Sequence, residues 1–251
     1  MTRLQAVFWD VDGTLADTEL SGHRPAFNRA FRDCALNWNW DEALYTELLS
    51  IPGGQQRIKF YAERNGEPLD SALLQRLRTA KQKHYLELVA TGSVKLRPGV
   101  QRLLTDLNNT GVRQWIVTSS GHASVDALLQ SLPKELGSVF EGIVTGDQVA
   151  RHKPHPDPYL RALELSAVKS DGVIALEDST PGLQSACAAG LRCLLTPSAW
   201  DRDLVRQHHQ AVAVVDQLGG DEASTILRGP PCAQGRITLE YLQLLLAEPL
   251  R

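Results

Sequence analysis

The sequence predicts an α/β protein: a doubly wound, mainly parallel Rossmann-like sheet with an all-helical domain inserted into it. Two observations carry this prediction. Short apolar runs that close on acidic or hydroxyl residues alternate with amphipathic helical stretches. One long segment between the first two runs contains helical patterns only. A hydrophobic content of 43% and a charged content of 22% agree with an ordinary globular protein.

The expected strands are residues 6–9, 114–117, 173–176 and 211–215, with a weaker candidate at 142–145. Asp10, Thr118 and Glu177 directly follow three of them. Strands separated by helices favour a parallel sheet. In such sheets ligands bind beyond the carboxyl ends of the strands, so these polar residues are the first candidates for a functional site.

From residue 18 to 91, helical apolar spacing recurs at 22–36, 41–50, 55–65 and 71–89. We therefore expect a core formed by residues 1–17 and 92–251, and a helical domain formed by residues 18–91.

Further helices are expected in the core. One lies near residues 122–130, and one begins with Asp157 as N-cap before Pro158. Another ends at Gly190, and a last one covers 238–246 after a Pro/Gly-rich loop.

Composition excludes several functions. A net charge of −3 provides no basic surface for nucleic acid. No uncharged apolar run reaches membrane-spanning length. The four cysteines show neither a Cys-x-x-Cys pair nor zinc-finger spacing, which indicates reduced thiols. We expect a cytoplasmic monomer, or a stromal one if the protein is processed into a plastid, acting on a small molecule.

The strongest functional signal is Asp10-Val11-Asp12-Gly13-Thr14, directly after the first strand. Asp10 can attack phosphorus, because carboxylates form phosphoenzymes. Asp12 can protonate the leaving oxygen and later accept a proton from water. Gly13 allows the turn to close. The alternative is a plain strand-to-turn junction, in which Asp and Gly are common.

A carboxylate nucleophile and a phosphate repel each other, so a divalent cation should bridge them. Mg²⁺ prefers hard oxygen ligands. Asp10 supplies one such ligand, and Glu177-Asp178 supplies the next. The alternative for the acidic pair is helix capping, with Asp178 or Ser179 starting the following helix. Capping and metal binding can coexist.

Two further segments have residues that can bind a phosphate or offset its charge. Thr118-Ser119 closes a strand and opens a helix, where a hydroxyl and backbone N–H groups can bind a phosphate oxygen. Simple capping by Ser119 or Ser120 is the alternative. Lys153 lies in a proline-stiffened loop and can offset charge on a transferring phosphoryl group.

Together the motifs at residues 10–14, Thr118, Lys153-Pro154 and residues 176–179 resemble the haloacid-dehalogenase-like phosphatases. The resemblance extends to about Gly220. It implies that the helical insertion is a cap domain and that Asp12 binds Mg²⁺ through its backbone carbonyl. In having an acidic residue at Asp12, the chain also resembles the phosphate-handling members of this superfamily, because the dehalogenases lack an acid at that position.

A closer resemblance is to the CbbY-type sugar-bisphosphate phosphatases of carbon-fixing organisms. It rests on segments of the helical insertion: Asp17-Thr18-Glu19, His23-Arg24, Ala26-Phe27-Asn28, Trp38-Asn39-Trp40-Asp41, Tyr45, Gly53-Gly54, Arg57-Ile58 and Lys81. By this resemblance the substrate-binding residues are Glu19, His23, Tyr45, Gly53, Gly54, Gln55, Gln56, Arg57 and Lys81, with Ser119 in the core. One departure stands out. Those relatives usually read Gly-Gly-Lys-Glu where this chain has Gly53-Gly54-Gln55-Gln56.

The resemblance implies a Mg²⁺-dependent phosphatase that removes the 1-phosphate of xylulose 1,5-bisphosphate, an inhibitor of ribulose-bisphosphate carboxylase. Two enzymatic alternatives stay open: a sugar-phosphate mutase resembling β-phosphoglucomutase, and a phosphatase of another small phosphate such as phosphoglycolate. A non-catalytic protein on the same fold could lose Asp10, Asp12, Lys153 or Asp178, yet all four are present. The segment after Gly229 has no counterpart in this resemblance.

Overall fold

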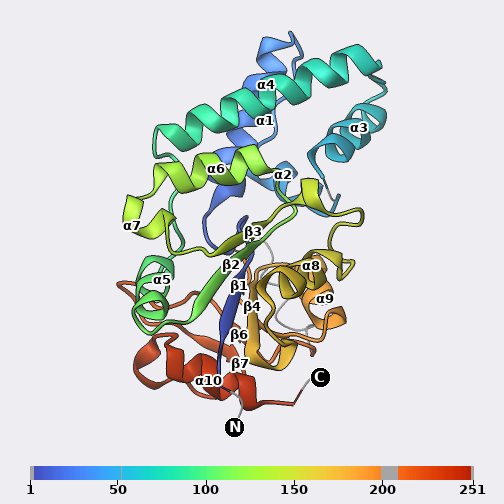
Figure 1. The fold of residues 1–251 in the computed structure, drawn as a ribbon. Helices are drawn as coiled ribbons and strands as arrows, with labels where there is room; N and C mark the ends of the chain where they lie inside the picture. Colours follow the sequence, from blue (N-terminus) through green and yellow to red (C-terminus); the bar gives the residue numbers. More distant parts are fainter. Residues whose placement is uncertain (1–2, 52, 199–208, 250–251) are drawn as a thin grey trace. The chain divides into compact units, whose positions relative to one another are not determined.

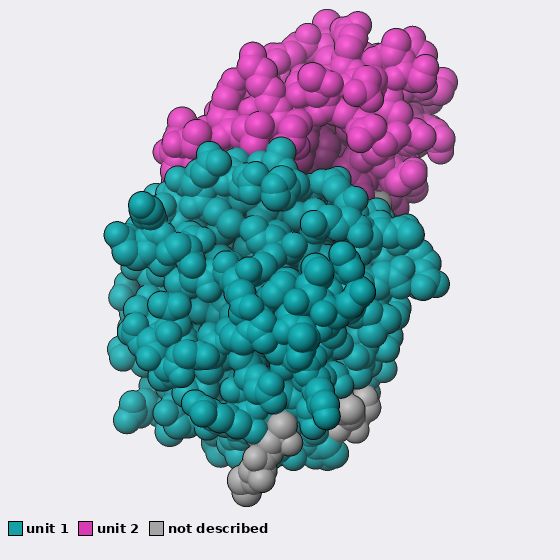
Figure 2. Space-filling model, viewed as in Figure 1, with its two compact units in different colours: residues 1–17, 95–251 teal, residues 18–94 magenta. Residues whose placement is uncertain are grey.

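The computed structural model describes residues 3–51, 53–198 and 209–249 (Figure 1). Its contacts divide the chain into two compact units (Figure 2). The core unit consists of residues 1–17 and 95–251, and the helical unit consists of residues 18–94. Each unit has its own cluster of buried apolar side chains.

Within its described residues, the core unit contains a seven-stranded sheet with the order β3-β2-β1-β4-β5-β6-β7 (Figure 1). The strands are β1 (Ala6–Trp9), β2 (Arg113–Val117), β3 (Gly142–Val144), β4 (Val173–Glu177), β5 (Arg192–Leu195), β6 (Ala213–Val215) and β7 (Ile226–Arg228). The first six are parallel, and β7 pairs antiparallel with β6 at the edge. The predicted α/β class with a mainly parallel sheet is confirmed.

Helices cover both faces of the sheet (Figure 1). On one face, α8 (Asp157–Ser166) and α9 (Thr180–Ala188) contact each other and the central strands. On the other, α5 (Val100–Asn109) contacts β2, and α10 (Leu239–Ala247) contacts α5, β4 and β5. The helices α6 (His122–Ser131) and α7 (Lys134–Gly137) follow β2.

The expected strands are all present, with ends that differ by no more than two residues. The strands β5 and β7 were not predicted. The first, Arg-Cys-Leu-Leu, comes two residues after Gly190, and the second has three residues. Neither contains a run of four consecutive apolar residues like the one that predicts β1. They are recognised as strands only from their pairing in the structure, β5 with β4 and β6, and β7 with β6.

The start of α8 corrects one prediction. Pro156 is its N-cap, and Asp157 is the first helical residue. The Asp157 carboxylate does not cap the helix, because it accepts two hydrogen bonds from the Arg151 guanidinium at 2.9 and 2.8 Å. In α9 the capping interpretation is confirmed for Ser179, whose Oγ accepts from the Gly182 amide at 3.3 Å.

The helical unit begins with a π-helical turn at Glu19–His23, which the sequence did not indicate. It continues with α1 (Arg24–Asp33), α2 (Glu42–Leu48), α3 (Gly54–Arg64) and α4 (Ser71–Ala90), near the four stretches of predicted helix. Asp41 and Asp70 cap α2 and α4 by accepting from backbone amides at 2.8 and 2.6 Å. The unit packs around an aromatic cluster: Phe27, Phe31, Trp38, Trp40, Tyr45 and Tyr61.

In the part of the chain that the structure describes, no helix combines the length and apolar character needed to cross a membrane. Cys34, Cys187, Cys193 and Cys232 form no disulfide in the structure.

Candidate active site

The order of the strands brings the predicted residues of the core together. β1 lies between β2 and β4, and Trp9 is paired with Ile116 on one side and Leu176 on the other. The carboxyl ends of these three strands therefore meet, and Asp10, Thr118 and Glu177 stand at the same edge. Backbone bonds extend past the strand ends and hold this edge in place, for example from the Asp10 amide to the Leu176 carbonyl at 3.0 Å.

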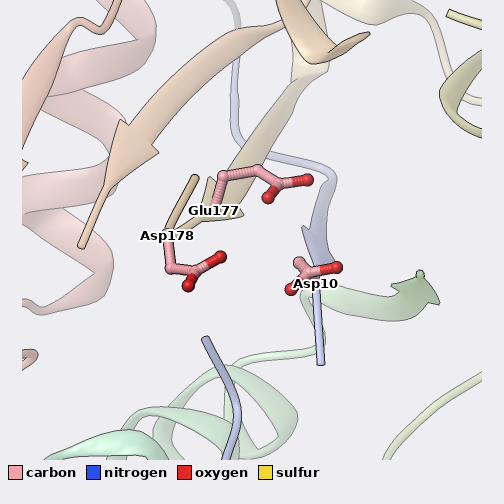
Figure 3. A group of neighbouring side chains, drawn as sticks. All are labelled: Asp10, Glu177 and Asp178. Atoms are coloured by element: carbon pink, nitrogen blue, oxygen red, sulfur yellow. The ribbon is translucent and has the colours of Figure 1, made fainter. Parts of the chain in front are cut away.

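Three carboxylates form the centre of the site. Asp10, Glu177 and Asp178 are all buried, and one oxygen of each lies within 4.8 Å of the others. Figure 3 shows the side chains approaching one another from the end of β1 and from the end of β4. The structure thus joins the first and last motifs, which are far apart in the sequence.

Lys153 links two of these carboxylates. Its ammonium donates to Asp10 Oδ1 at 2.7 Å, to Glu177 Oε1 at 2.6 Å and to the Val117 carbonyl at 2.8 Å. The Lys153 side chain is only 6% exposed. It is therefore a fixed buried charge, and three acceptors use its three donors.

Burial controls the electrostatics of the nucleophile candidate. It raises the pKa of Asp10 to about 8, helped by the negative charges of Glu177 and Asp12 and opposed by Lys153. Burial alone would lower the pKa of Lys153, but Asp10 and Glu177 outweigh it and raise that pKa above its ordinary value. The site therefore has an excess of negative charge that its own lysine does not balance.

These residues fit a hard divalent cation. The donors are carboxylate oxygens, which Mg²⁺ prefers. Oε2 of Glu177 is buried and has no hydrogen-bond partner among the described residues, a costly arrangement that a bound cation would relieve. The buried acidic cluster of Asp10, Glu177 and Asp178 is typical of a magnesium site.

Two glycines make room for these carboxylates. Gly13 has a φ of +85°, and a Cβ there would overlap the Asp178 carboxylate. A Cβ on Gly182, in the first turn of α9, would overlap the Glu177 carboxylate. Gly13 was expected as a turn residue. The role of Gly182 was missed, because a glycine near the start of a helix carries no sequence signal of its own.

Asp12 and the residues after β2 complete this edge. Ser120 Oγ donates to Asp12 Oδ2, and Thr118 Oγ1 accepts from the Ser120 amide at 3.0 Å. Thr118 is buried and Ser119 is exposed.

Neither Ser119 nor Ser120 caps α6, whose N-cap is Gly121. The Asp147 carboxylate accepts from the first amide of that helix at 2.8 Å instead.

Comparison with known proteins agrees with this geometry. The family model of the haloacid dehalogenase-like hydrolases matches residues 7–196. CbbY of Rhodobacter capsulatus is 44% identical over 200 residues, which cover 79% of this chain and 88% of that protein. The plasmid CbbY of Cupriavidus necator is 38% identical over 244 residues, or 93% of this chain and 92% of that protein.

A solved structure adds to these relatives. CbbY from Rhodobacter sphaeroides in complex with xylulose 1,5-bisphosphate matches with a TM-score of 0.77 and 34% identity, over 86% of this chain and 97% of that one. The chain belongs to the CbbY family of haloacid dehalogenase-like phosphatases. The resemblance inferred from the motifs is thereby confirmed.

The helical unit contains most of the residues that the resemblance to CbbY predicts to bind the substrate. Tyr45 is fully buried, and its hydroxyl donates to Glu19 Oε2 at 2.5 Å. Arg57 is 7% exposed and donates to the Tyr45 hydroxyl at 3.0 Å and to the Leu48 carbonyl at 2.9 Å. Glu19, Tyr45 and Arg57 thus form one hydrogen-bonded chain inside the unit.

A second group lies on the π-helical turn, α1 and α4. Lys81 Nζ is 3.0 Å from His23 Nδ1, and it lies over the rings of Phe27 and Tyr85 at 5.3 and 5.0 Å.

The Gly-Gly-Gln-Gln segment forms the start of α3. Gly53, with a φ of +84°, is the N-cap, and Gly54 is the first helical residue. Gln55 is half-buried and Gln56 is exposed.

Arg97 is a residue that sequence reasoning missed. Its guanidinium donates to the carbonyls of Gly13, Thr196, Pro197 and Asp216, which come from the ends of β1, β5 and β6. Burial lowers its pKa. It therefore ties together the loops that hold the site. A single arginine outside any motif is indistinguishable in sequence from a solvated surface charge.

The raised pKa of Asp10 predicts how the metal-free protein responds to pH. An unfolded aspartate has a pKa of about 3.9, whereas that of Asp10 is raised to about 8. The folded state then binds the additional proton, so this group lowers stability progressively as the pH rises from about 4 to about 8. Lys153 does not titrate in this window, because its pKa is raised.

Asp10→Asn removes this titration. With a chelator present, we expect the melting temperature of the wild type to fall relative to that of the variant between about pH 5 and about pH 8. Thermal melts of both proteins at several pH values measure the difference. A difference that does not change with pH contradicts the assignment.

Proposed function

We propose that this protein is a Mg²⁺-dependent phosphatase that works through an aspartyl phosphate on Asp10 and removes the 1-phosphate of xylulose 1,5-bisphosphate. The observation that carries the chemistry is the buried acidic cluster in which Lys153 bridges Asp10 and Glu177. The substrate rests on the relative from Rhodobacter sphaeroides, whose structure is a complex with that bisphosphate.

In the first step, a carboxylate oxygen of Asp10 attacks phosphorus and the bond from phosphorus to the sugar oxygen breaks. Asp12 donates the proton that the leaving sugar oxygen needs. Ser120 holds the Asp12 carboxylate in place. Lys153 already contacts Asp10, so it offsets negative charge on the nucleophile and on the phosphoryl group that arrives there.

In the second step, water attacks the phosphorus of the aspartyl phosphate. Asp12 accepts the proton of that water, the bond between Asp10 and phosphorus breaks, and inorganic phosphate leaves. Thr118 and Ser119 bind the phosphate oxygens in both steps. Mg²⁺, held by Asp10, Asp178, Glu177 and the Asp12 carbonyl, would neutralise the phosphate and bring it to the carboxylate.

The phosphate that stays on the sugar requires a cation of its own, because a buried and unpaired phosphate is strongly unfavourable. Gln55 has no charge. The donors of Arg57 are bound to Leu48, Ile51 and Tyr45 inside the helical unit, and the side chain is buried. We therefore assign the second phosphate to Lys81, and we assign to Arg57 the positioning of Tyr45 and Glu19.

Release of inorganic phosphate tests the function. With Mg²⁺, we expect phosphate release from pentose bisphosphates at one position only, and faster than from sugar monophosphates or phosphoglycolate. A chain that interconverts sugar phosphates without releasing phosphate is a mutase. Higher efficiency on phosphoglycolate than on any pentose bisphosphate contradicts the substrate and leaves the phosphatase chemistry standing.

Lys81→Ala is expected to lower kcat/KM for the bisphosphate by about a hundredfold, and that for a pentose monophosphate by less than about threefold. The reason is that only the bisphosphate presents a second phosphate to this ammonium. Steady-state kinetics on both substrates measure the two losses.

Lys83→Ala is the matched control, because Lys83 lies on the same helix with a side chain 71% exposed and only a 4.0 Å pair to Glu87. It should leave both substrates unaffected. Equal losses on both substrates in Lys81→Ala refute the assignment of Lys81.

A further inference from the structure

A buried tyrosine contacts the active site, although no motif contains it. Tyr159, in the first turn of α8, is fully buried. Its hydroxyl donates to Glu177 Oε1 at 2.5 Å. Lys153 donates to the same oxygen at 2.6 Å and lies 5.2 Å from the centre of the Tyr159 ring. Two donors from one short segment of chain therefore converge on one oxygen of Glu177.

The two oxygens of Glu177 have different surroundings. Oε1 accepts from both Tyr159 and Lys153, whereas Oε2 has no hydrogen-bond partner among the described residues. Gly182 closes the other side, since a Cβ there would overlap the carboxylate. The carboxylate is thus held in one orientation, with one oxygen used by the protein.

The hydroxyl contributes little to packing. The Tyr159 ring lies in an apolar cluster with Phe8, Val117 and Leu183, where a phenylalanine ring would pack as well. A buried hydroxyl in such surroundings is tolerated only because it has an acceptor. Its effect is therefore to orient that acceptor, Glu177.

We propose that Tyr159 is a positioning residue that acts through Glu177. It holds Oε1 against Lys153, so that the ammonium stays between Glu177 and Asp10 and the Glu177 carboxylate keeps one orientation within the acidic cluster. Partners that orient metal-binding carboxylates commonly change metal affinity by 10–100-fold when they are removed. The proposal rests on the Mg²⁺-dependent function proposed above.

Tyr159→Phe removes the hydroxyl and keeps the ring. In the intact chain, we expect it to raise the Mg²⁺ dissociation constant, measured by calorimetry without substrate, by about tenfold. We also expect kcat at saturating Mg²⁺ to fall and KM for the sugar phosphate to stay unchanged.

Tyr241→Phe is the matched control, because the Tyr241 hydroxyl donates to the Pro230 carbonyl at 2.9 Å, outside the site. It should bind Mg²⁺ as the wild type does.

A double-mutant cycle with Glu177→Gln tests whether Tyr159 acts through Glu177. If it does, Tyr159→Phe weakens Mg²⁺ binding by less than about twofold in the Glu177→Gln background. Equal losses in both backgrounds overturn the proposal. So does a Tyr159→Phe protein that melts at a lower temperature yet binds Mg²⁺ normally, because its hydroxyl then serves stability alone.

The same titrations separate this proposal from the proposed function. A wild-type protein that binds no Mg²⁺ refutes both. A wild type that binds Mg²⁺ and releases phosphate, beside a Tyr159→Phe variant with unchanged Mg²⁺ affinity and kcat, refutes only the role of Tyr159.

Discussion

Asp10→Asn is expected to lower kcat at least about a thousandfold while leaving the fold intact. The carboxylate of Asp10 follows β1 directly, is held by Lys153 and belongs to the buried acidic cluster. An amide in its place lacks the charge and the nucleophilic oxygen that covalent transfer requires. Phosphate release under saturating Mg²⁺ and substrate measures the loss, and thermal melting verifies the fold.

The control for this variant is Asp106→Asn on α5, an exposed aspartate paired with Arg102 at 3.1 Å. The same chemical change there should leave kcat within about twofold of the wild type. Exposed ion pairs contribute little to the stability of the fold, so the variant should fold as the wild type does. An Asp10→Asn protein that retains more than about a thousandth of the wild-type rate would falsify covalent catalysis through Asp10.

Removal of Mg²⁺ is expected to abolish turnover, and Asp178→Asn should weaken Mg²⁺ binding by about a hundredfold or more. The site presents three buried carboxylates, and the excess negative charge repels a phosphate until a cation neutralises it. Activity is measured after exhaustive chelation and again after Mg²⁺ is restored. Calorimetry without substrate measures the affinity of the variant.

Calcium provides a second readout for the same site. Ca²⁺ binds carboxylates with longer bonds and looser geometry than Mg²⁺. It should compete for the cluster and inhibit, because the nucleophile and the phosphate are then misplaced. Turnover that survives chelation, or full activity with Ca²⁺, rules out the proposed metal site.

The sequence was sufficient to predict the fold class, the family and the residues at the core of the site. These features depend on local patterns. An apolar run followed by Asp, Thr or Glu marks both a strand and its carboxyl end, as at Asp10, Thr118 and Glu177. Parallel strands place such ends at one edge, so the motifs predict a common site without any knowledge of the strand order.

Only the tertiary structure showed how these residues are held. Lys153 reaches Asp10 across 143 positions of sequence, and Arg97 joins carbonyls up to 119 positions away. Tyr159 and Gly182 contact the Glu177 carboxylate from two different helices.

The burial of Tyr45 and Arg57 likewise appeared only in the packed helical unit. Such contacts depend on which side chains meet after the chain has folded. The spacing of apolar residues indicates which face of a helix or strand is buried, but it does not identify the residues that pack against that face.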